Sequence, residues 1–324
     1  MLLQFLPMSA LNIADDSFRM TFSRNLDALV SSMKTIGIVQ PILVRHTVDG
    51  TYQIVTGYRR VLASQKLARQ TIPALVYEHT DLSVLQAFLY NLHDNLATRQ
   101  LSIVEKSNTL HKLAYVYSTA EDELVKRYLP MMGEEPSYKV LHQLLSLHQC
   151  SGPMKELVVD HQYALSSAAR IAEFSPTTQE ALLSVLRPLR ATTAKLNELL
   201  SMIREISARD AMTVEEVLQR YQLLSVVADP GVAPTAKMAA LRQTLRGVRL
   251  PTLARRQQQF AGLLQELQLP NMAKITADPY FEDNKLKLEC QIRGPEELET
   301  IVSHLQKAFE RQAWHKIFDW YNSI

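Results

Sequence analysis

The sequence predicts an α+β protein that is mostly helical, and three observations lead to this fold class. Short alternating apolar runs with a turn signal between them predict strands within the first hundred residues. Helical periodicity then continues from residue 101 to about residue 220 without strand signals. A strand pair and a helix follow near the C-terminus. At 324 residues and 47% hydrophobic content, the chain can bury sizeable cores and should divide into several domains.

The first hundred residues should fold as a small mixed α/β domain. Two apolar, β-branched runs flank the Asp49-Gly50 dipeptide, which favours a hairpin. Thr80 or Asp81 is expected to cap the helix that follows the last strand. The expected elements are a helix over 25–36, strands over 41–45 and 52–55, a helix over 58–69, a strand over 72–77 and a helix over 82–96.

The first of these helices should be buried along one face. Apolar side chains recur in it at helical spacing, and Gly37 follows as a C-terminal stop. The side chains expected on the buried face are Leu26, Leu29, Val30, Met33 and Ile36.

A glycine and two arginines open the helix expected at residue 58. Gly57 follows a strand directly, and Arg59 and Arg60 lie in the first turn of the helix. The free N–H groups and the positive dipole end of a helix start favour an anion, and two guanidinium groups add charge and forked donors. The sequence therefore predicts a phosphate-binding site here. The structural alternative is a pair of surface arginines whose stems pack along the sheet edge.

The helical region contains a candidate helix-turn-helix. Residues 121–132, a turn over 133–135 and residues 136–148 have its proportions, with glycine in the turn and proline at the second helix start. The second helix would enter the major groove of DNA. Any helical bundle offers such helix pairs, so an ordinary surface helix is the alternative. The side chains expected to contact DNA are Ser137, Tyr138, Lys139, His142 and Gln143.

The order of these motifs resembles the ParB family of DNA partition proteins over roughly residues 20–205. That family has an "I…G…QPI.VR" segment, a Gly-Glu-Arg-Arg motif and a helix ending in Glu-Asn-x-x-Arg. The corresponding stretches here are Ile36–Arg45, Gly57–Arg60 and Asp94-Asn95, followed by the helical motifs at 144–147, 153–158 and 164–171. Two motifs depart from the family pattern. Tyr58 replaces the glutamate of the first, and the second has Asp94 in place of its glutamate and Thr98 in place of its last arginine, which is displaced to Arg99.

The resemblance implies a site for CTP and Mg²⁺. Arg59 and Arg60, beside Gly57, would contact the triphosphate, and Gln40 would lie near the ribose or base. Asp94 and Asn95 would hold Mg²⁺, which prefers hard oxygen ligands. For Asp94 and Asn95 the alternative is a solvated helix end.

Composition excludes several classes of protein. No apolar run reaches eighteen residues and no secretory signal pattern opens the chain, so we expect a cytoplasmic protein without a membrane partner. Cys150 and Cys290 are expected to be reduced thiols, because two distant cysteines make neither a disulfide framework nor a zinc site. The net charge of +2 argues against a protein that coats nucleic acid indiscriminately.

The C-terminal part should hold a basic helix and a small ββα module. Six basic and no acidic residues lie between residues 237 and 256, which favours a solvated face, a tether or a phosphate-contacting arm. Residues 274–281 should pair with residues 285–293 through a turn at 282–284. Because the core of one hairpin and one helix is marginal alone, we expect this module to pair with a second copy. The following helix should bury Leu298, Ile301, Val302, Leu305 and Phe309.

The leading hypothesis is a homodimeric, nucleoid-associated ParB-like protein that binds double-stranded DNA in chromosome or plasmid partition. A CTP-gated clamp, slow CTP hydrolysis and a ParA-like ATPase partner are what the resemblance implies, and the sequence shows no catalytic residue for hydrolysis. The alternatives are a DNA-binding transcriptional regulator without nucleotide turnover and a nucleotide-dependent kinase on the same fold. The expected domains are 1–100 for nucleotide, 101–225 for DNA, 226–270 as a basic linker and helix, and 271–324 for dimerisation.

Overall fold

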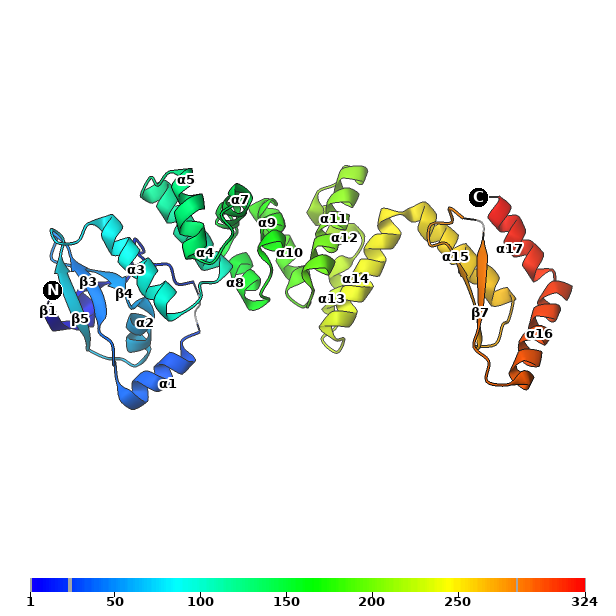
Figure 1. The fold of residues 1–324 in the computed structure, drawn as a ribbon, viewed down its shortest axis with the longest axis horizontal. Helices are drawn as coiled ribbons and strands as arrows, with labels where there is room; N and C mark the ends of the chain where they lie inside the picture. Colours follow the sequence, from blue (N-terminus) through cyan, green and yellow to red (C-terminus); the bar gives the residue numbers. More distant parts are fainter. Residues whose placement is uncertain (1, 23–24, 284, 324) are drawn as a thin grey trace. The chain divides into compact units, whose positions relative to one another are not determined.

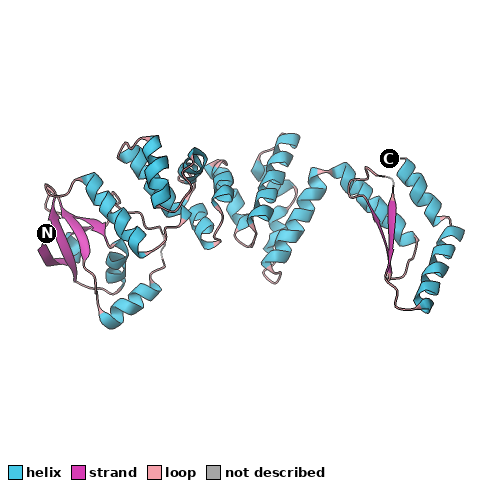
Figure 2. Cartoon of the chain, viewed as in Figure 1, coloured by secondary structure: helices cyan, strands magenta, loops and turns pink. Residues whose placement is uncertain are grey.

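The computed structural model describes residues 2–22, 25–283 and 285–323. Its internal contacts divide the chain into two compact units, Met1–Leu200 and Ser201–Ile324. Helices dominate both units and strands occur at two places (Figure 2), which confirms the α+β, mostly helical class. Within the described residues, no helix combines the length and apolarity needed to cross a membrane.

A five-stranded sheet with the order β1-β5-β3-β4-β2 forms the N-terminal part of the first unit. β3 and β4 form the predicted antiparallel hairpin, and β3 pairs in parallel with β5. β1 and β2 were not predicted, because most side chains of β1 are exposed and β2 is only two residues long. The strands are β1 (Leu2–Pro7), β2 (Leu11–Asn12), β3 (Ile42–His46), β4 (Tyr52–Thr56) and β5 (Thr71–Glu78).

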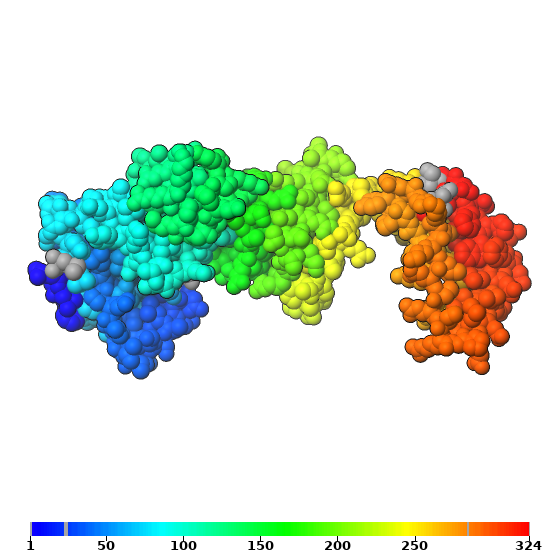
Figure 3. Space-filling model, in the orientation of Figure 1, coloured from blue at the N-terminus to red at the C-terminus, as the bar shows by residue number. Residues whose placement is uncertain are grey.

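Helix α3 (Val84–Thr98) lies between the sheet and the following helices, as Figure 1 shows. Its Phe88 and Leu92 belong to one buried cluster that also contains Val55 of the sheet and Leu110 of α4. A second cluster joins the sheet to α2. The surfaces on the two sides of residue 100 meet without a gap in Figure 3, so packing within the first unit continues across this expected domain boundary.

The remaining helices of the first unit follow the predicted order with shifted ends. Ser83, rather than Thr80 or Asp81, caps α3 through a capping box with Gln86. Of the predicted buried face, Leu26 and Met33 are buried and Leu29 and Val30 are half-buried, whereas Ile36 at the end of α1 is 65% exposed. These elements are η1 (Met8–Ala10), α1 (Asp27–Ile36), α2 (Tyr58–Lys66), α4 (Ile103–His111), α5 (Glu121–Glu123), α6 (Leu129–Met131), α7 (Tyr138–Leu147), α8 (Gly152–Asp160), α9 (Leu165–Ala172) and α10 (Pro176–Leu186).

Two π-helical segments interrupt the helices before α7. They are η2 (Lys112–Val116), which continues α4, and η3 (Leu124–Tyr128), which joins α5 to α6. In η2 the N–H of Tyr117 donates to the carbonyl of Lys112 at 3.0 Å, a five-residue separation. Such widened turns often occur at functional sites.

In the second unit, a layer of helices leads into a small C-terminal core. α15 packs into this core through Phe260, which stacks on Trp320, so the region expected to be a linker is partly structural. Helix α11 (Thr193–Asp210) carries the boundary between the units. The other elements are α12 (Val214–Arg220), α13 (Leu223–Ala228), α14 (Pro234–Arg249), α15 (Pro251–Glu266), β6 (Ala273–Ala277), β7 (Leu286–Cys290), α16 (Pro295–Glu310) and α17 (Ala313–Asn322).

The C-terminal strand pair is present, but its apolar face is more open than predicted. β6 and β7 are antiparallel, with Ile275 opposite Leu288. In α16 only Ile301 of the predicted set is fully buried, Leu305 is partly buried, and the other three side chains are exposed, because α17 covers a single stripe of the helix. Asn284 of the predicted turn lies outside the described residues. The exposed side chains are Leu298, Val302 and Phe309.

Candidate functional site

The site begins at the glycine between β4 and α2. Gly57 has φ +89°, in the left-handed region, and is the N-cap residue of α2. A Cβ at this position would lie 2.7 Å from Cγ2 of the fully buried Ile42. Only glycine fits both the backbone and the space. α2 has no side-chain cap, so no side chain of the protein occupies the free N–H groups and the positive end of this helix.

Two arginines of α2 enter this cleft and bond to uncharged backbone oxygens. Arg60 Nη1 donates to the carbonyls of Gln40 at 2.6 Å and Pro41 at 2.7 Å. Arg59 Nη2 donates to the carbonyl of Asn25 at 2.8 Å. Among the described residues, Arg59 Nε is buried without a hydrogen-bond partner. Burial lowers the pKa of Arg60 and the negative charge of Asp94 opposes this effect. The pair therefore brings positive charge and an unused donor to the cleft.

Helix α3 supplies the acidic and amide groups on the opposite wall. Asp94 is exposed, and Asn95 is half-buried one residue later. Asn95 Oδ1 accepts from Arg99 Nε at 2.8 Å, and its Nδ2 donates to Asn91 Oδ1 at 2.7 Å. Both ends of the Asn95 amide are therefore in use within the chain.

A buried carboxylate holds Arg99 in place. Glu105 is 2% exposed and accepts from Arg99 Nη1 at 2.7 Å and from the N–H groups of Phe22 and Ser102 at 3.0 Å each. Burial alone would raise the pKa of Glu105, but these hydrogen bonds and the positive charge of Arg99 outweigh it and lower the pKa. Arg99 is therefore neutralised by the protein itself.

The two arginines of α2 and Asp94, Asn95 and Arg99 of the opposite wall line one cavity of about 250 Å³. It brings together every residue that the sequence assigned to nucleotide or metal: Gln40, Gly57, Arg59, Arg60, Asp94 and Asn95. Sequence reasoning missed Arg19, which also lines the cavity, and treated Tyr58 and Arg99 only as departures from a motif. Their positions depend on partners distant in sequence, so no local pattern could reveal them.

The donor set suits a hard cation only in part. The Asp94 carboxylate is exposed and suits Mg²⁺, whereas the Asn95 oxygen already accepts from Arg99. Within the described residues, no group of three or more His, Cys, Asp or Glu side chains could hold a metal alone. A metal here would therefore need Asp94 together with ligand and water oxygens.

The helix predicted to read DNA lies in the same unit, and carboxylates of a preceding helix bond to two of its side chains. α7 begins at Tyr138 with Ser137 as its N-cap, two residues later than predicted, because residue 136 lies in a bend outside the helix. Tyr138 Oη donates to Asp122 Oδ1, and His142 Nε2 lies 2.5 Å from Glu121 Oε1. Lys139 is exposed and Gln143 is half-buried. Two of the five expected contacts are thus held by carboxylates.

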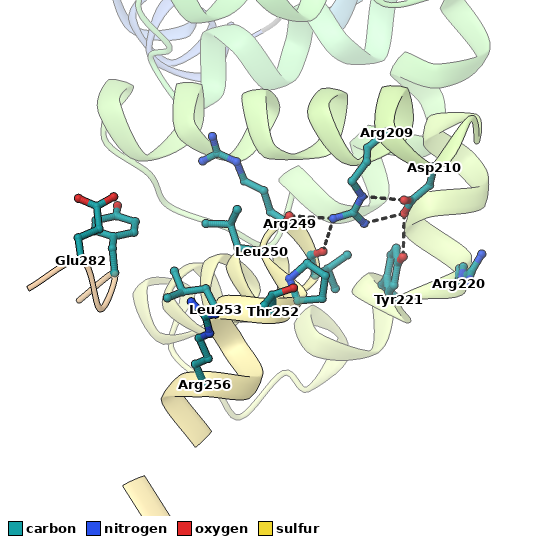
Figure 4. A pocket seen from close by; sticks show the side chains of 13 residues that line it. Arg209, Asp210, Arg220, Tyr221, Arg249, Leu250, Thr252, Leu253, Arg256 and Glu282 are labelled. Carbon is teal, nitrogen blue, oxygen red and sulfur yellow. Dashed lines mark hydrogen bonds and ion pairs between the residues drawn. The ribbon is translucent and has the colours of Figure 1, made fainter. Parts of the chain in front are cut away.

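A second, larger cleft of about 860 Å³ lies in the other unit, beside α14 and α15. Figure 4 shows Arg209 bound by both oxygens of Asp210, at 2.7 and 2.8 Å, with Tyr221 Oη donating to the same carboxylate. Arg209 Nη1 also donates to the carbonyls of Val248 and Arg249. The Arg249 guanidinium pairs with Glu205.

Comparisons with known proteins support the sequence resemblance. Residues 2–92 match the ParB N-terminal domain family. A probable chromosome-partitioning protein ParB of Vibrio cholerae is 24% identical over 198 residues, which cover 61% of this chain and 64% of that protein. A chromosome-partitioning protein ParB of Caulobacter vibrioides is 30% identical over 158 residues, covering 44% of this chain and 51% of that protein. The matches thus span about half to two thirds of these relatives.

Solved structures of Caulobacter crescentus ParB are also similar to this chain. The C-terminally truncated protein complexed with CTP-gamma-S has 24% sequence identity, covers 58% of this chain and 99% of its own, and gives a TM-score of 0.28. The same protein complexed to the centromeric parS site has 20% identity, covers 67% and 99%, and gives a TM-score of 0.34. Scores this low carry no argument about shape, so the assignment depends on the sequence matches and the family domain. Residues 2–92 of this chain therefore form a ParB N-terminal domain, and the sequence similarity to ParB proteins extends beyond it.

Proposed function

We propose that this ParB-like chain is a DNA-binding partition protein whose N-terminal cleft binds CTP with Mg²⁺. The observation that carries the proposal is that Arg59, Arg60 and Asp94 line one cavity at the open start of α2. Its curated relatives include chromosome-partitioning proteins, and the Caulobacter protein was crystallised with CTP-gamma-S and with parS. This combination supports nucleotide-dependent DNA binding over a purely structural cleft.

The triphosphate would accept hydrogen bonds from guanidinium N–H groups that now donate only to uncharged oxygens or have no acceptor. Arg59 offers its buried Nε, and Arg60 offers a guanidinium whose present acceptors are carbonyls. A phosphate oxygen forms stronger, charge-assisted bonds with both groups than a carbonyl does. The N–H groups of α2 add to this binding. Bound Mg²⁺ would neutralise phosphate charge, and Asp94 would hold it with phosphate and water oxygens. Asn95 could join only after Arg99 releases it.

We expect this cleft to hydrolyse a bound nucleotide only slowly. The cleft carries arginines and one exposed carboxylate, and positioning and charge stabilisation are what such groups supply. We assign no catalytic residue. Binding alone is enough for a clamp that closes on DNA and reopens on release.

Helix α7 is the proposed DNA reader, and Lys139 is its main phosphate contact. Lys139 is exposed, whereas Tyr138 and His142 are held by Asp122 and Glu121 and would be freed only as DNA approaches. We expect Lys139→Ala to weaken binding to a duplex selected from a random pool and to reduce the salt dependence by about one phosphate contact. Fluorescence anisotropy at several salt concentrations measures both effects. Unchanged affinity and salt slope would exclude this contact.

The C-terminal module is the proposed site of homodimerisation. Leu298, Val302 and Phe309 form an exposed apolar stripe at helical spacing on α16, and Leu288 is exposed on β7. Pairing with a second copy would remove this apolar surface from water. Light scattering should give a dimer for the wild type and a monomer for Val302→Glu, and a monomeric wild type would reject this role.

Calorimetric titration tests the nucleotide proposal directly. CTP should bind in the presence of Mg²⁺ and more weakly with EDTA, because the metal offsets charge between Asp94 and the phosphates. Absence of any CTP binding would reject the clamp. It would favour the second candidate, a DNA-binding regulator without nucleotide, which the engagement of Asn95 by Arg99 also favours.

A further inference from the structure

The segment over residues 16–20 carries an arginine that the nucleotide motifs do not include. Phe18 and Met20 are 2% and 1% exposed and lie in the main core. Arg19 lies between them and lines the N-terminal cavity. Its Nη1 donates to Tyr58 Oη at 2.9 Å, and its guanidinium carbon lies 5.1 Å from the Tyr58 ring centroid. The buried neighbours therefore anchor the backbone that carries Arg19.

A lysine from the helical region holds this segment by its backbone. The Lys112 side chain, at the start of η2, is 14% exposed, and its Nζ donates to the carbonyls of Ser17 at 3.3 Å and Arg19 at 3.2 Å. It also bonds to the carbonyl of Asp16, whose carboxylate lies 3.9 Å away. An ammonium group has three donors, so these carbonyls use its full capacity. Burial lowers the pKa of Lys112, and the charge of Asp16 opposes this.

We propose that Arg19 is a further phosphate-binding residue of the N-terminal cleft and that Lys112 is the positioning residue that holds it there. This inference rests on the proposed nucleotide function. The present acceptor of Arg19 is a neutral phenol, and a phosphate oxyanion in the cavity is a stronger acceptor, so Arg19 exchanges one for the other. Lys112 keeps the Arg19 backbone in place while the side chain moves. The same lysine connects the cleft to η2 and α4, which packs on α7.

A double-mutant cycle on CTP affinity tests both roles. Titration of the full chain with CTP and Mg²⁺ should show about tenfold to hundredfold weaker binding for Arg19→Ala, the loss expected for one charged hydrogen bond. Lys112→Met should weaken binding about tenfold although it does not line the cavity. Arg19→Ala with Lys112→Met should be no weaker than Arg19→Ala alone, because Lys112 acts through Arg19. Additive losses would overturn the positioning role.

Lys155→Met is the matched control. Lys155 is also partly buried in the same unit and donates to a backbone carbonyl, that of His148, at 2.7 Å. It should change thermal stability without changing CTP affinity, and Lys112→Arg should recover at least part of the lost affinity. A loss of affinity in Lys155→Met equal to that in Lys112→Met would mean that general destabilisation causes both effects and would overturn the proposal.

The possible outcomes distinguish a failure of the Arg19 proposal from a failure of the proposed CTP binding. A wild-type chain that binds no CTP rejects the proposed function and the inference together. A wild-type chain that binds CTP, loses it in Arg59→Ala with Arg60→Ala, and keeps it in Arg19→Ala rejects the inference alone. Circular dichroism and a thermal melt of each variant confirm that it folds.

Discussion

Two clefts of this chain are lined by arginines, one in each compact unit, and they differ in what those arginines already bind. In the larger cleft, of about 860 Å³, Arg209 is bound bidentately by Asp210 and Arg249 pairs with Glu205. In the smaller one, of about 250 Å³, Arg59 and Arg60 bond to backbone carbonyls, and only Arg99 has a carboxylate among the contacts described.

The difference shows that size and arginine content do not define an anion site. A guanidinium that already has a carboxylate gains little from a phosphate, because the new bond replaces one of similar strength. A guanidinium bonded to a carbonyl gains a full charge interaction. The smaller cleft also has the open start of α2 behind a glycine that no other residue can replace.

The largest effect should come from removing the arginines of each cleft in turn. Arg59→Ala with Arg60→Ala should weaken CTP binding by roughly a hundredfold or more, since each charged hydrogen bond contributes about 1.5–3 kcal/mol. Arg209→Ala with Arg249→Ala should leave CTP affinity unchanged. Calorimetric titration of both variants, with DNA binding measured separately, gives the comparison. Equal losses in the two variants would remove the distinction between the clefts.

The second prediction compares the carboxylates that neutralise arginine. Glu105→Gln should lower the free energy of unfolding by about 3 kcal/mol near neutral pH, because it removes the buried carboxylate that neutralises the partly buried Arg99. The folded-state pKa of Glu105 lies below its unfolded value. Its contribution is therefore complete above the unfolded pKa of about 4.3 and is lost as pH falls through the folded pKa.

Urea unfolding at several pH values checks this, with hydrogen exchange assigning the affected unit. The difference between wild type and Glu105→Gln should shrink in acid. Asp210→Asn should have a smaller effect, because its pair with Arg209 is more exposed. Hydrogen bonds from Arg209 lower the pKa of Asp210 to about 2, so that pair should persist until the pH falls to about 2. A difference for Glu105→Gln that does not change with pH would contradict the ionised state of this carboxyl.

The third prediction compares a glycine near each cleft. Gly57→Ala should destabilise the first unit by about 2 kcal/mol, from the positive φ and the 2.7 Å approach to Ile42. Gly247→Ala in α14 should be neutral or stabilising by about 0.5–1 kcal/mol, because its new Cβ meets only Ala254 at 4.0 Å. Thermal or urea unfolding of the two variants checks the signs. A neutral Gly57→Ala would show that the strand and helix can separate at this point.

The smallest effect should come from the helix that carries Asp94. Ser83→Ala should cost about 1 kcal/mol by removing the cap of α3. Asp81→Ala, two residues earlier, should change stability by less than about 0.5 kcal/mol. The order of these two values, measured by urea unfolding, decides which residue caps the helix.

Local signals in the sequence were enough to predict the hairpin and the glycine that opens α2. The Asp49-Gly50 turn, the apolar and β-branched residues of β3 and β4, and the glycine between β4 and α2 all act within a few residues. The α3 cap was assigned to Thr80 or Asp81, but the helix begins later, where Ser83 pairs with Gln86. Arg19 was missed because Lys112, 93 residues later, places it. The exposure of Ile36 depends on how much of α1 its neighbours cover, which periodicity cannot show.

The π-helical segment η2 has a consequence for how the chain tolerates changes in length. A π turn accommodates one residue more than an α turn, so it marks a place where an insertion can be absorbed without breaking a helix. Deleting Ala114 would let this turn revert to α geometry and would leave the residues after it close to their present orientation. Lys112 precedes the deletion and keeps its contacts. Natural variants of this chain that differ in length by a single residue should therefore differ here.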